Sequence, residues 1–67
     1  MILSATTKKK KNVIYKASLE VFHDIEHEKV IYNINYLIID TFKKASFTSF
    51  KKACEFYKKV CKIINKI

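Results

Sequence analysis

The feature that most constrains this chain is that its 67 residues include neither glycine nor proline. Tight turns usually depend on glycine, proline, asparagine or aspartate, so we expect few tight turns and favour helices over hairpins. The absence of glycine also excludes the glycine-rich loops that hold phosphates in nucleotide hydrolases and dinucleotide-binding enzymes. The length allows one small domain with a thin core.

The C-terminal segment has the clearest pattern. Its apolar side chains recur every three or four residues, at Phe50, Ala53, Cys54, Tyr57, Cys61 and Ile64. Lysines fill the other faces of the corresponding helical wheel. Thr48 or Ser49 can accept a backbone N–H hydrogen bond at the start of this segment. We therefore predict an amphipathic helix over about residues 48 to 66.

Two earlier segments, residues 12–26 and 30–42, fit two different periods. As a helix, the first segment gathers its apolar residues on one face, at Val13, Ile14, Ala17, Val21 and Ile25. The odd-numbered residues of the same segment also alternate with their neighbours, as they would in a strand. A hairpin would turn at residues 23–28, HDIEHE, where aspartate is the only favoured turn residue. We therefore predict helices in both segments.

The first eleven residues, MILSATTKKKK, end in four lysines that repel one another and have no apolar face to bury. We predict a flexible basic N-terminal arm over residues 1–11 and a single small helical domain over residues 12–67. The expected fold is all-α, with two or three helices. The alternative is an α+β fold in which a β-hairpin packs on the C-terminal helix.

Fourteen lysines, no arginine and six acidic residues give a formal charge of +8. This excess attracts polyanions, although AT-rich codon usage would also enrich lysine. Lysine supplies point charges for phosphates, whereas arginine supplies the fork that reads guanine. We predict a small, basic, non-enzymatic protein that binds the nucleic-acid phosphate backbone. The predicted contacts are ten lysines of the arm and the helix: Lys8, Lys9, Lys10, Lys11, Lys51, Lys52, Lys58, Lys59, Lys62 and Lys66.

A second hypothesis is a structural or regulatory subunit that docks its amphipathic helices on a protein partner, such as an acidic surface. Thin cores and large apolar faces are often completed by another chain, so a homo-oligomer also fits. The two hypotheses differ in salt dependence, because apolar docking persists in salt that weakens polyanion binding. The tyrosines could stack on bases, but at helical spacing such residues more often belong to the core.

The sequence predicts no catalytic residue, no metal and no cofactor. His23 and His27 could share a zinc ion if they lay one helical turn apart, but a third ligand and a cleft are missing. No run approaches the roughly 18 to 20 apolar residues of a membrane span. Cys54 and Cys61 are seven residues apart on the predicted helix, too far to bridge. We therefore expect free thiols and an intracellular location, in the cytoplasm or an organelle matrix.

Overall fold

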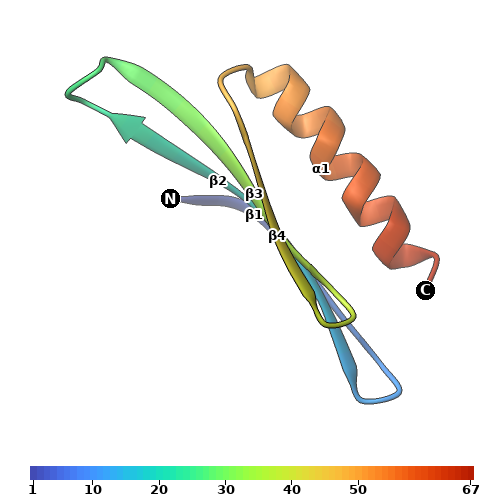
Figure 1. The fold of residues 1–67 in the computed structure, drawn as a ribbon. Coiled ribbons are helices and arrows are strands. Elements are labelled where there is room, and N and C mark those ends of the chain that lie inside the picture. Colours follow the sequence, from blue (N-terminus) through green and yellow to red (C-terminus); the bar gives the residue numbers. More distant parts are fainter.

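A computed structural model describes residues 1–67 and shows a four-stranded antiparallel sheet with one helix on one of its faces (Figure 1). The elements are β1 (Ile2–Lys10), β2 (Val13–Asp24), β3 (Lys29–Ile38), β4 (Thr41–Phe47) and α1 (Phe50–Asn65). Each strand pairs with its neighbour in the sequence, in the order β1-β2-β3-β4. The predicted all-α fold is therefore wrong, whereas the α+β alternative is correct, with four strands in place of one hairpin.

The two segments with double periodicity are strands. In β2 the odd-numbered residues Tyr15, Ala17 and Leu19 are buried, and Ile34 of β3 is buried beside them. The helical wheel placed Ile25 in the apolar face, but its side chain is 78% exposed. Buried and exposed residues alternate along β2 because successive side chains of a strand point to opposite faces of a sheet.

The predicted flexible arm is also wrong, because residues 2–10 form β1. This strand is hydrogen-bonded to β2 in a register that places Thr6 opposite Ala17 and Lys9 opposite Ile14. The lysine run therefore ends an ordered edge strand and continues into the turn that follows it. Mutual repulsion of the lysines is weakened here because alternate side chains leave opposite faces of the strand.

Three hairpin turns form without glycine. Lys11 and Asn12 both have positive φ, as in the type I′ turns that match the twist of a hairpin. In the four-residue loop before β3, the Asp24 carboxylate accepts hydrogen bonds from the His27 backbone N–H at 3.3 Å and pairs with the His27 ring at 2.8 Å. Ile39, in the turn before β4, has a φ of 58°, which costs an L-residue roughly 1–2 kcal/mol. Asparagine, aspartate and local strain thus replace glycine.

The predicted C-terminal helix is confirmed as α1. The Ser49 hydroxyl accepts a hydrogen bond from the Lys52 backbone N–H at 3.3 Å and caps the helix. The buried side of α1 packs on β2 and β3 to form a core of eight residues: Tyr15, Ala17, Leu19, Ile34, Ala53, Tyr57, Val60 and Ile64. At 16 residues with five lysines, this helix is too short and too polar to cross a membrane.

The opposite side of the sheet has no element packed on it, and we call it the uncovered face (Figure 1). The strand register aligns its side chains in rows across the sheet. One row contains Thr7, Lys16, Leu37 and Phe42, and the next contains Ala5, Ser18, Asn35 and Lys44. These rows mix small, polar, cationic and apolar groups, so the uncovered face is not a second apolar core.

Candidate nucleic-acid interface

The six predicted lysines of the C-terminal segment form one surface, which we call the helix lysine face. They are Lys51, Lys52, Lys58, Lys59, Lys62 and Lys66. At about 100° per residue they fall within an arc of roughly 120°, on the side of α1 opposite its buried residues. All six are exposed, and Glu55 is the only acidic residue in α1. The sequence prediction of a lysine-covered helix surface matches this arrangement.

The four predicted lysines of the N-terminal segment lie at the tip of the β1–β2 hairpin. Lys8 and Lys10 are on the side of β1 that faces α1, while Lys9 is on the uncovered face. Lys11 is in the turn itself. The hairpin holds these four lysines in a fixed arrangement instead of presenting them on a mobile tail.

Lys8 joins the hairpin tip to the end of the helix. Its ammonium group donates hydrogen bonds to the carbonyl oxygens of Asn65 at 3.4 Å and Ile67 at 3.3 Å. The last carbonyls of a helix lack partners within the helix and carry partial negative charge, so a cation stabilises them. Lys8 thus has a structural role that the sequence did not reveal, and its contact ties the β1–β2 tip to the C-terminal end of α1.

The lysine charges are not neutralised within the chain. The only close contact between a carboxylate side chain and a basic side chain joins Asp24 and His27, and no lysine ammonium lies within 4.0 Å of an aspartate or glutamate carboxylate. Three of the six acidic residues, Asp24, Glu26 and Glu28, lie at the β2–β3 turn, at the opposite end of the sheet from the β1–β2 tip. Half of the acidic residues are therefore gathered, together with Lys29, at the end of the sheet away from the β1–β2 tip.

The four tyrosines do not form a base-stacking surface. Tyr15 and Tyr57 are buried in the core. Tyr32 and Tyr36 are half-buried beneath α1, where their rings lie 5.3 Å from Phe50 and 5.9 Å from Phe56, respectively. All four are therefore on the covered side of the sheet, as expected for core and rim residues.

The uncovered face carries exposed aromatic and cationic groups that the sequence prediction missed. Phe42 is 68% exposed and Phe22 is 55% exposed. A shallow hollow of about 330 Å³ lies beside Lys16, Asn35 and Phe42. Only the strand register shows these side chains to be neighbours, so a helical prediction could not find them.

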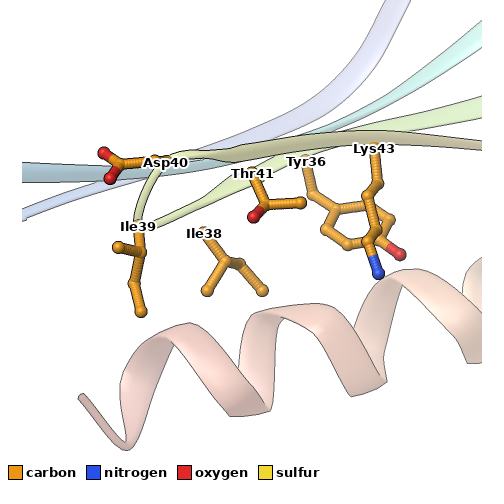
Figure 2. A pocket seen from close by; sticks show the side chains of 6 residues that line it. All are labelled: Tyr36, Ile38, Ile39, Asp40, Thr41 and Lys43. Carbon is orange, nitrogen blue, oxygen red and sulfur yellow. The ribbon is translucent and has the colours of Figure 1, made fainter.

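A second shallow groove, of about 420 Å³, is lined by residues of the β3–β4 hairpin (Figure 2). The side chains of Ile38 and Ile39 point toward the helix, and the ammonium group of Lys43 does so as well, whereas Asp40 points away (Figure 2). This groove combines an apolar wall with a single cation. Nothing in it resembles a set of groups arranged for acid–base or nucleophilic chemistry.

The histidines and cysteines are not gathered into a metal-binding group or joined by a disulfide. His23 is in β2 and His27 is in the following turn, so they are not one helical turn apart. No group of three or more possible metal-binding side chains forms in the structure. Cys54 and Cys61 are half-buried free thiols on α1. The Cys61 sulfur lies 3.7 Å from the Thr6 hydroxyl, which is itself 3.2 Å from the Tyr57 hydroxyl.

Comparisons with protein families, with curated proteins and with solved structures find nothing that matches this chain.

Proposed function

We propose that this protein is a small, non-enzymatic, intracellular nucleic-acid-binding protein that contacts the phosphate backbone. The observation that carries the proposal is that Lys8 joins the β1–β2 tip to the C-terminal end of α1, where the helix lysine face ends. No aspartate or glutamate is paired with any of these lysines. Unpaired positive charge at this density is attracted most strongly to a polyanion.

The dimensions of α1 suit contact with several phosphates. Lys51 and Lys66 are 15 residues apart, which corresponds to roughly 22 Å along a helix axis. One strand of duplex DNA places a phosphate about every 3.4 Å along its axis, so this length spans about six phosphates. Because lysine provides point charges and no bidentate fork, binding by this surface is expected to depend little on base sequence.

The contribution of Lys8 differs from that of the other predicted contacts. Its ammonium group is already bonded to the carbonyl groups at the end of α1, whereas the ammonium groups of the other nine lysines donate no hydrogen bond within the chain. We therefore assign Lys8 to joining the two basic elements and the other nine to phosphate contact.

The intracellular location is proposed from the thiols. Cys54 and Cys61 are both free, and free cysteines in a small chain are typical of a reducing compartment.

Binding to labelled single-stranded and duplex nucleic acid should be measured by fluorescence anisotropy at about 50 and 200 mM salt. If six or more lysines meet phosphates, affinity falls roughly a thousandfold over this range. Replacing Lys58, Lys62 and Lys66 by glutamine should weaken binding at least about tenfold and reduce the slope of log affinity against log salt by about three. A matched triple variant, Lys16→Gln, Lys29→Gln and Lys44→Gln, removes the same charge from other surfaces.

The matched triple variant should have the smaller effect. If the two triple variants weaken binding equally, overall charge and not the helix lysine face determines affinity. If the unmodified protein does not bind at 50 mM salt, the nucleic-acid proposal is overturned. An acidic protein surface is then the best remaining partner for the same lysines.

The protein-docking hypothesis requires a different surface from the one that the sequence suggested. The apolar side of α1 packs on the sheet through Ala53, Tyr57, Val60 and Ile64, so it is not open to a partner. The exposed rings of Phe22 and Phe42 make the uncovered face the alternative surface for a protein.

A further inference from the structure

The sheet has two free edges, because β1 and β4 each pair on one side only. A free edge presents a row of unpaired backbone N–H and C=O groups to which another strand can add. Proteins commonly protect such edges with short strands and with charged side chains, lysine above all. The two edges of this sheet differ in both respects.

The β4 edge is protected along its centre. This strand has seven residues, and Lys43 and Lys44 occupy its middle. The β1 edge has nine residues, and its first six, Ile2–Thr7, carry no charge. The lysines of β1 are confined to its last three positions, where Lys8 is held by the end of α1. Ile2 and Leu3 are also exposed apolar residues.

We infer that the β1 edge pairs with the β1 edge of a second copy of this chain, antiparallel and around a two-fold axis at Ala5. An antiparallel pair with this axis places Ser4 opposite Thr6 and Leu3 opposite Thr7 of the second copy. The two sheets then form one continuous eight-stranded sheet. This inference concerns the free protein and does not depend on nucleic acid.

Charge separation favours this edge over β4. With the axis at Ala5, the two copies of Lys8 are six residues apart along the pair, or about 20 Å, which exceeds the Debye length of about 10 Å at 0.1 M salt. The closest like charges are at the two ends of the pair, where the Met1 ammonium group is opposite Lys9 of the second copy. Pairing two β4 strands around Lys44 would place the two copies of that lysine directly opposite each other. Like charges in that position destabilise a strand pair.

The pairing is expected to be weak and symmetric. The irregular register between Ile2 and Ser4 shortens the regular part of the edge, so the contact is smaller than the roughly 1,200–2,000 Å² of most stable complexes. A two-fold axis perpendicular to the sheet places both helices on the same side of it. The dimer therefore presents two helix lysine faces in one direction.

Sedimentation equilibrium of the unmodified protein without nucleic acid tests the inference directly. At about 300 mM salt, where repulsion between the +8 chains is screened, the mass should rise from one chain toward two between about 5 µM and 1 mM. Lowering the salt should weaken the dimer, which is opposite in sign to the expected effect on polyanion binding. A single-chain mass at 1 mM overturns the inference. A mass that exceeds two chains also overturns it, because β1 would then be pairing with β4 in an open chain.

Two lysine substitutions separate the edges. Ala5→Lys places a lysine opposite its own copy and should raise the dissociation constant about tenfold. Thr41→Lys adds the same charge to the β4 edge and should change it less than about twofold. Mixing Ala5→Lys with Ala5→Glu should restore the dimer as a mixed pair, which also shows that both variants are folded. Equal weakening by Ala5→Lys and Thr41→Lys, or no mixed dimer, contradicts pairing at β1.

Discussion

On the face of the sheet that α1 covers, Ala17, Leu19 and Ile34 are buried, with at most 4% of each residue exposed. On the uncovered face of the same two strands lie Ser18 and Asn35, which are half-buried and polar. The contrast follows from the number of layers: a chain of 67 residues that uses four segments for a sheet has one helix left to cover it. The covered face therefore holds the fold together, and the uncovered face is free to meet solvent or a ligand.

The largest expected effect comes from comparing two apolar residues of β3 that point to opposite faces. Ile34→Ala should lower the free energy of unfolding by about 2–5 kcal/mol, because Ile34 is fully buried and its removal leaves a cavity. Leu37→Ala, on the uncovered face, should cost about 1 kcal/mol. Urea denaturation followed by circular dichroism measures both. Equal losses would mean that something else buries the uncovered face.

A smaller test compares two hydrogen bonds, one on each face. The Tyr57 and Thr6 hydroxyls lie 3.2 Å apart beneath the helix, whereas the exposed Ser46 hydroxyl donates to the Asn33 side-chain oxygen at 2.7 Å on the uncovered face. Tyr57→Phe should destabilise the protein by about 1 kcal/mol.

Ser46→Ala should cost less than about 0.5 kcal/mol, since water replaces the lost partner. The same urea titration measures both values. A Ser46→Ala loss as large as that of Tyr57→Phe would contradict the assignment of stability to the covered face.

The smallest effects come from two adjacent lysines of β1. Lys8→Ala removes hydrogen bonds to the end of α1 and should lower stability by about 0.5–1 kcal/mol. Lys9→Ala, whose side chain leaves the other face, should change stability by less than about 0.3 kcal/mol.

Thermal denaturation at low and high salt checks the assignment of these two lysines. Part of the Lys8 effect should persist at high salt, because one of its two hydrogen bonds, to Ile67, is partly buried, whereas the bond to Asn65 is exposed. Equal effects from both lysines would show that net charge, and not the helix contact, is responsible.

The C-terminal helix could be predicted from the sequence because only one period fits it. Residues 50–64 place apolar side chains every three or four positions, and Ser49 supplies the cap that the structure uses. The same helical wheel correctly placed the lysines of that helix on its exposed surface. What the sequence could not show is that Lys8 contacts the end of this helix, since that depends on how β1 pairs with β2.

The prediction of helices within residues 12–40 was wrong because their apolar residues satisfy both periods at once. The choice between helix and strand depended on whether the chain could form hairpin turns, and the absence of glycine argued against such turns. The structure forms its turns with Asn12 and Asp24 and by holding Lys11, Glu28 and Ile39 at positive φ. Pairing between the strands offsets the conformational cost of these turns. A prediction from local propensity alone does not include the energy of that pairing.

The separation of acidic and basic residues has a consequence for how the molecule moves. Its long dimension is 44 Å, with Asp24, Glu26 and Glu28 at one end of the sheet and Lys8–Lys11 at the other. This uneven charge is spread along the longest dimension of the molecule. The field of a polyanion therefore both attracts the +8 chain and exerts a torque on it, which favours encounters in which the β1–β2 tip leads.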